Sequence, residues 1–234
     1  MKTALLVCDY VKPEFLHIDG DYPAMFQNLF PSLELEVFFV CDNTFPQNVN
    51  DFHAYIVTGS SYSVYDPVDW IIRLKAFVKA IYEAKIPYIG VCFGHQLLGE
   101  SLGGKVEKSA VGWCVGVHEF QILHQMEWME PKADAVNLLM SCQDQIAQLP
   151  PDTKVLASAA KCPYGMIQVG ENMFGVQAHP EFSKAYNQAL MQARISRIGE
   201  EVVKEGIASL KLPLHREILQ SWIELFLAKT HIAY

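Results

Sequence analysis

Short apolar segments alternate with amphipathic segments through the N-terminal half of the chain, and this alternation restricts the possible folds more than any other feature. The apolar segments have the length and composition of buried strands, and they comprise residues 3–8, 35–41, 54–58 and 88–92. The segments between them are typical of helices, and they comprise residues 22–30, 68–84 and 94–102. The alternation therefore predicts an α/β fold, a doubly wound and mostly parallel sheet with helices on both faces.

The C-terminal half has a different pattern, in which apolar segments follow one another closely. We expect these segments to add antiparallel strands beside the parallel sheet, at residues 115–123, 136–140, 154–160, 165–169 and 173–177. Two helices are expected to close the chain, at residues 184–205 and 214–228, with Gly206 and Pro213 between them. No linker divides the sequence, so we expect one domain over residues 1–234, with a core in 1–183 and the C-terminal helices in 184–230.

The composition argues against several classes of protein. Apolar residues make up 51% of the 234 residues and charged residues only 19%, which excludes a mainly disordered chain. The net charge of −8 disfavours nucleic acid as a partner. No run of about 18 apolar residues occurs, so no membrane-spanning helix is expected. Asp9 interrupts the short N-terminal apolar run and the six cysteines are scattered, so we expect a cytoplasmic protein.

The sharpest chemical signal is the segment Gly90-Val91-Cys92-Phe93-Gly94, which follows an apolar strand and opens a helix. A tight strand-to-helix turn of this kind presents its central side chain to a cleft, and the flanking glycines avoid steric overlap. The thiol would lie at a helix N-terminus, which favours the thiolate. The backbone N–H of Phe93 would point at a developing oxyanion. The segment predicts Cys92 as a nucleophile, although glycine-rich turns also arise from packing alone.

A thiol nucleophile needs a base, and the best candidate lies in the segment Gln177-Ala178-His179-Pro180-Glu181. His179 can exchange a proton with Cys92, and Glu181 can accept the other imidazole N–H and select the tautomer. The alternative is that this segment is only the polar entry to a helix. The remaining histidines have no metal-ligand spacing with cysteine or acidic residues, so no metal and no organic cofactor is expected.

The two segments together resemble the class I glutamine amidotransferase domain, whose catalytic triad is Cys-His-Glu. The branch that they resemble comprises the glutaminase domain of GMP synthase and its stand-alone relatives. The resemblance extends over residues 1–183 and implies a flavodoxin-like sheet. It also implies that Cys92, His179 and Glu181 are the triad.

The resemblance implies roles for several further residues. Gly59, in a glycine loop over residues 57–66, would supply the second oxyanion N–H, and Ser60 next to it would contact substrate. Gln96, in the pattern C-x-G-x-Q, matches a residue that contacts the glutamine substrate. Ser141 and Cys142 begin a loop whose backbone would hold the α-amino and α-carboxylate groups. The branch usually has histidine where this chain has Cys142.

These residues predict hydrolysis of the glutamine side-chain amide to glutamate and ammonia, through a γ-glutamyl thioester. No phosphate-binding loop for ATP occurs in the sequence, so the ammonia acceptor would be a separate synthetase subunit. One alternative keeps the chemistry and changes the substrate, making the chain a γ-glutamyl peptidase. Another is a non-catalytic regulatory or binding module, and the intact Cys92, Gln96, His179 and Glu181 argue against it.

Overall fold

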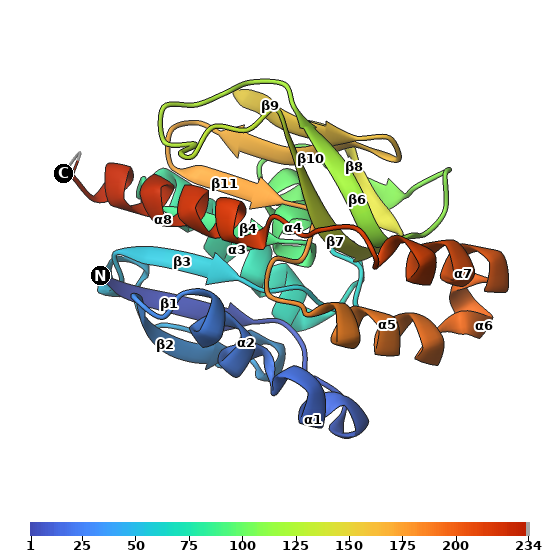
Figure 1. Cartoon of the computed structure of the whole chain (residues 1–234). Coiled ribbons are helices and arrows are strands. Elements are labelled where there is room, and N and C mark those ends of the chain that lie inside the picture. The colour runs from blue at the N-terminus through green and yellow to red at the C-terminus, as the bar shows by residue number, and fades with distance from the viewer. Residues whose placement is uncertain (233–234) are drawn as a thin grey trace.

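The computed structural model describes residues 1–232, and one large sheet runs through it (Figure 1). Its nine strands lie in the order β2-β1-β3-β4-β11-β10-β9-β6-β7. Their bounds are β1 Lys2–Val7, β2 Glu34–Phe39, β3 Ala54–Val57, β4 Tyr88–Val91, β6 Cys114–Ile122, β7 Ala135–Cys142, β9 Thr153–Ala159, β10 Cys162–Val169 and β11 Met173–Val176. The strands from β2 to β11 in this order are parallel, and those from β10 to β7 are antiparallel. The predicted α/β sheet with antiparallel additions is confirmed.

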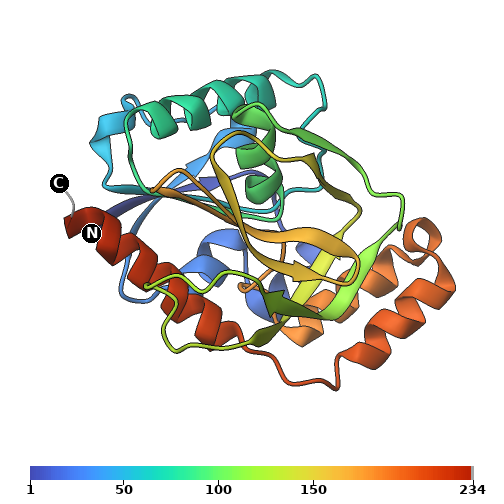
Figure 2. The same cartoon turned by 90° about the horizontal axis from the view of Figure 1, so that it is seen from above.

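Helices cover both faces of the sheet, and seen from above α3 and α8 lie on opposite sides of it (Figure 2). The helices are α1 Leu16–Asp19, α2 Tyr22–Leu29, α3 Asp69–Glu83, α4 Phe93–Ser101, α5 Lys184–Ala193, α6 Ile195–Ile198, α7 Glu200–Ser209 and α8 Arg216–Ile232. Among residues 1–232, no helix is both long enough and apolar enough to cross a lipid bilayer.

Alternation along the parallel strands produces two separate cores. In β1, Leu5 and Val7 pack on the side of α2, α5 and α8, whereas Ala4 and Leu6 pack on the side of α3 and α4. Successive side chains of a strand point to opposite faces, so a strand covered on both faces is apolar throughout. This explains why the parallel strands read as continuous apolar runs in the sequence.

The C-terminal helices differ from the expectation. The single helix expected over residues 184–205 is divided into α5, α6 and α7, with breaks at Arg194 and at Gly199, whose φ is 100°. Gly206 was expected between helices but lies inside α7, where an added Cβ would come within 2.6 Å of the Met191 sulfur. Glycine therefore serves there to bring α7 close to α5, not to end a helix.

Two short strands were not expected from the sequence. β5 Lys105–Lys108 pairs antiparallel with β8 Asp144–Gln148 in a separate two-stranded sheet. Both segments are rich in polar residues, and only single apolar side chains such as Val106 and Ile146 are buried against α4 and its neighbours. Periodicity over four or five residues is too short a signal to predict such strands.

Candidate active site

The turn between β4 and α4 holds Cys92 in a strained backbone conformation, with φ 50° and ψ −99°. The glycines on either side allow this turn. A Cβ on Gly90 would lie 2.4 Å from the carbonyl oxygen of Gly94, and a Cβ on Gly94 would lie 2.4 Å from the carbonyl oxygen of Val57. Positive φ at a non-glycine residue is uncommon and concentrates at functional sites. A turn made only for packing would not need a cysteine in this conformation.

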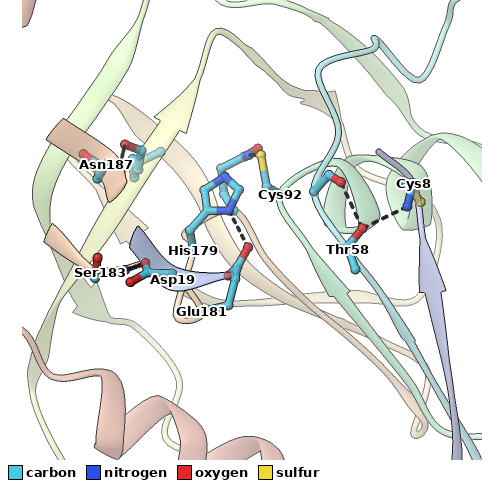
Figure 3. Close-up of polar contacts among 11 residues, drawn as sticks. Cys8, Asp19, Thr58, Cys92, His179, Glu181, Ser183 and Asn187 are labelled. Atoms are coloured by element: carbon cyan, nitrogen blue, oxygen red, sulfur yellow. Dashed lines mark hydrogen bonds and ion pairs between the residues drawn. The ribbon is translucent and has the colours of Figure 1, made fainter. Parts of the chain in front are cut away.

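His179 and Glu181 lie in the loop between β11 and α5, and both are buried. The Nδ1 atom of His179 lies 2.8 Å from Oε1 of Glu181. Figure 3 shows the imidazole between the Glu181 carboxylate and the side chain of Cys92. The His179 backbone N–H donates to the carbonyl oxygen of Leu139 at 2.8 Å, and the Phe182 ring stacks on the imidazole at 4.1 Å. The imidazole is thus oriented by contacts on several sides.

The charges around His179 favour its protonated form. Burial by itself lowers the pKa of this imidazole, but the charges of Cys92 and Glu181 and the hydrogen bonds to both raise the pKa to about 10. With Nδ1 held by Glu181, Nε2 is the nitrogen available to the thiol. The arrangement therefore favours an imidazolium at His179, held between Cys92 and Glu181.

Gly59 lies directly against Cys92 and His179. A Cβ at this position would lie 2.9 Å from Cε1 of His179 and 3.8 Å from Cβ of Cys92. The loop after Gly59 is anchored, because the Ser60 hydroxyl donates to the carbonyl oxygen of Cys8 at 3.0 Å and the Ser61 N–H donates to Asp9 at 2.7 Å. Only glycine lets this anchored backbone approach the thiol and the imidazole together.

A cleft that is open to solvent lies beside Cys92. It brings together the residues predicted to contact substrate, which are Ser60, Gln96, Ser141 and Cys142. The Phe93 side chain packs against the Trp70 ring at 5.8 Å and does not line the cleft. Five of the predicted residues therefore line the cleft, namely Ser60, Cys92, Gln96, Ser141 and Cys142. Gly59, His179 and Glu181 lie behind Cys92, in contact with one another and outside the lining of the cleft.

The sequence matches a family model over this whole region. Residues 30–196 match the model described as glutamine amidotransferase class-I. The chain belongs to this family. The match includes Cys92, His179 and Glu181, and it extends into α6.

Individual amidotransferase relatives and neighbours agree with this assignment. The chain is 27% identical to gamma-glutamyl peptidase 3 of Arabidopsis thaliana, over 77% of this chain and 76% of that protein. It is 31% identical to the glutamine-hydrolysing GMP synthase of Azoarcus sp. (strain BH72), over 62% of this chain and 29% of that protein. Its fold is similar to the crystal structure of a glutamine amidotransferase from Thermotoga maritima, with a TM-score of 0.75, 14% identity and coverage of 99% and 98%.

One polar contact of Cys92 was not predicted from the sequence. Gln177 is fully buried, its Nε2 donates to Sγ of Cys92 at 3.5 Å, and its Oε1 accepts from Nε2 of Gln96 at 3.2 Å. Gln96 also donates to the carbonyl oxygen of Asp144 at 2.7 Å. The signal in the sequence was a polar residue directly after the apolar segment Met173–Val176, which marks a side chain that needs a buried partner.

Replacing Gln177 should slow the reaction of the thiol in this amidotransferase. We expect Gln177→Leu to lower the alkylation rate of Cys92 by roughly tenfold at neutral pH, because a hydrogen bond to a charged group contributes about 1.5 kcal/mol. Timed iodoacetamide labelling with mass spectrometry measures this rate. Gln168→Leu is the matched control, since Gln168 is buried but donates to the carbonyl oxygen of Gly170. Equal rates in the two variants would remove Gln177 from the site.

Proposed function

We propose that the chain hydrolyses γ-glutamyl amide bonds through Cys92, His179 and Glu181, with glutamine as the simplest substrate. The observation that carries the proposal is the strained Cys92 beside an imidazole whose other nitrogen lies 2.8 Å from a buried carboxylate. A nucleophile, a base and an orienting group in this order are the requirements of covalent amide hydrolysis.

The reaction begins when the Cys92 thiolate attacks the amide carbon of the substrate. The backbone N–H groups of Gly59 and Phe93 would hold the oxyanion of the tetrahedral intermediate. The imidazolium of His179 gives its proton to the departing nitrogen, which leaves as ammonia or an amine, and a γ-glutamyl thioester remains on Cys92. Water then transfers a proton to His179 and attacks the thioester, which releases glutamate and the thiolate. Glu181 keeps the imidazole oriented and stabilises its charge in both steps.

Substrate contacts would come from the cleft. Ser60, Gln96, Ser141 and Cys142 all line it. The Ser60 hydroxyl is already bound to the carbonyl oxygen of Cys8, so its contribution to substrate would come through the backbone or the remaining lone pair. In a chain that transfers ammonia, a separate synthetase subunit would receive it.

A second candidate function is that of a γ-glutamyl peptidase, in which the leaving group is an amine of a peptide and not ammonia. The similarity to gamma-glutamyl peptidase 3 over 76% of that protein favours it. A release assay with the purified chain separates the two functions. Glutamate and ammonia from glutamine would indicate a glutaminase, whereas faster release of glutamate from γ-glutamyl dipeptides would indicate a peptidase. No glutamate from any of these substrates would contradict both.

The carboxylate of Glu181 should matter less than the thiol. In Glu181→Gln the amide can present an N–H to Nδ1 of His179, which favours the wrong tautomer and withdraws the charge that stabilises the imidazolium. We expect turnover to fall roughly 10²- to 10⁴-fold, with slow labelling of Cys92 by an alkylating glutamine analogue retained. Glu205→Gln on the exposed face of α7 is the control. Turnover at the parental rate would remove Glu181 from the triad.

Cys142 replaces the histidine that is usual in the branch, and it should affect substrate binding. It ends β7, lines the cleft and is only 5% exposed, and burial together with the charge of Cys92 raises the pKa of its thiol well above the usual value. We expect Cys142→His to change KM more than kcat, by roughly thirty- to 150-fold if two or three hydrogen bonds of about 1 kcal/mol each change. Steady-state kinetics of Cys142→His and Cys142→Ala on glutamine and a γ-glutamyl dipeptide measure this. A collapse of kcat with unchanged KM would show a catalytic thiol.

A further inference from the structure

We propose that Arg194 and Arg197, together with Trp113, form a subsite that binds a free carboxylate on the leaving group of a γ-glutamyl peptide. The inference rests on the proposed function, and it adds the chemical class of the leaving group. All three side chains line the same cleft as Cys92. None of them belongs to the segments that carry the proposed catalytic and substrate-binding residues.

The break between α5 and α6 places the two arginines. Arg194 ends α5 and precedes α6, and Arg197 lies three residues later in that single turn of helix. Residues three apart in a helix share one face. Gly199, with φ 100°, then redirects the chain into α7. The short turn formed by residues 194–198 therefore brings both arginines to the cleft.

Trp113 orients one of the guanidinium groups. It precedes Cys114, which pairs with Cys142 across β6 and β7, so Trp113 lies beside the loop that follows β7. The guanidinium of Arg197 lies over the Trp113 ring at 5.1 Å. A guanidinium held by its face keeps its N–H groups available at the edge, where they can bind a carboxylate in a bidentate manner.

Neither arginine has an acidic partner within the described part of the chain. The ion pairs among residues 1–232 involve other cations, namely Lys2, Lys75, Lys105, Lys132, Lys204 and His179. Arg194 is half-buried, which makes an unpaired charge there more costly than on an open surface. In a chain with a net charge of −8, two unpaired arginines at one cleft favour an anionic ligand.

The charges of the cleft fit a peptide better than they fit glutamine. Asp144 contributes one carboxylate to the cleft, where it accepts a hydrogen bond from the Ser63 hydroxyl. The Asp144 carboxylate and the two guanidinium groups of the cleft would complement a ligand with one ammonium group and two carboxylates. Glutamine has one ammonium group and only one carboxylate. A γ-glutamyl peptide with a free C-terminus has a second carboxylate, which lies on the leaving group. The subsite would therefore select acidic γ-glutamyl peptides over glutamine.

The test compares γ-glutamylglycine with γ-glutamylglycinamide, which differ only in that terminal carboxylate. Binding is measured by calorimetry on a Cys92→Ala chain, so that the result does not depend on turnover, and KM is measured on the chain with Cys92 intact. We expect the acid to bind roughly tenfold more tightly than the amide, and Arg194→Gln/Arg197→Gln to reduce this ratio to about one. Added salt should weaken the preference in the parent chain.

Two further variants make the test specific. Arg73→Gln is the matched control, because the Arg73 guanidinium also lies over an aromatic ring, that of Phe45 at 4.1 Å, but outside the cleft. It should leave the acid-to-amide ratio unchanged. Arg197→Lys keeps the charge without the planar group and should retain part of the preference. A parent chain that binds acid and amide equally, or a double variant with an unchanged ratio, would overturn the subsite. Absence of glutamate release in a chain that still prefers the acid would instead contradict the proposed hydrolysis.

Discussion

Cys92→Ala is expected to lower the rate of amide hydrolysis by roughly 10⁴-fold or more while the chain stays folded. The thiol is the atom that would form the bond to the substrate, and no other group in the cleft is held beside an imidazole paired with a carboxylate. Alanine also has a Cβ, so the backbone strain at φ 50° changes little. Ammonia and glutamate release, with circular dichroism to verify folding, measures the effect.

A second buried cysteine provides the control for this variant. Cys162 is 2% exposed and lies on β10, and it does not line the cleft. Cys162→Ala should retain activity within a few-fold of the parent and should still be labelled at Cys92 by a reactive glutamine analogue. A folded Cys92→Ala chain with near-parental turnover would contradict the proposal that Cys92 is the nucleophile.

Gly94→Ala is expected to have the largest effect on stability. Its new Cβ would lie 2.4 Å from the carbonyl oxygen and 3.0 Å from Cβ of Val57, in β3. This strand is paired on both sides, by β1 and β4, so it has little room to move away. We expect a loss of about 3 kcal/mol or more in the free energy of unfolding, the upper part of the range for overpacking. For a chain of this size that corresponds to a fall in Tm of roughly 6–12 °C.

An alanine substitution at Gly112 distinguishes destabilisation by steric overlap from destabilisation by backbone strain. Gly112 has φ 77°, but an added Cβ would meet nothing within 4 Å. Gly112→Ala should therefore cost only about 1 kcal/mol, from the left-handed backbone conformation. Thermal and denaturant unfolding of both variants compare the two costs. Equal stabilities of the two variants would show that the turn between β4 and α4 relaxes around the methyl group that alanine adds at position 94. The close approach of α4 to β3 would then not be essential for stability.

Much of the site was predictable because its signals are local. The spacing of Gly90, Cys92 and Gly94 between an apolar strand and a helix specifies the turn, and a Cβ added at either glycine would lie 2.4 Å from a backbone oxygen. His179 and Glu181 lie two residues apart, so a single turn after β11 suffices to bring them together at 2.8 Å. Such features depend on a few neighbouring residues and on the sterics of a short turn.

Other features depend on contacts between distant segments, and the sequence alone did not predict them. Residues 184–209 are divided into α5, α6 and α7 at Arg194 and Gly199, and Gly206 allows α7 to pack closely against Met191 and Val115, which helical periodicity does not reveal. That division places Arg194 and Arg197 at the cleft.

The order of the strands has a similar origin. Pairing β11 with β4 puts Gly175 opposite Gly90, and it is this pairing that brings Gln177 and His179 to Cys92 across more than eighty positions of sequence. The sequence by itself determined the alternating strands and helices, the tight turn that holds Cys92 and the proximity of His179 to Glu181. The tertiary structure decided which side chains share the cleft with that thiol, because long-range packing and pairing are set by the shapes of the assembled elements and not by local propensity.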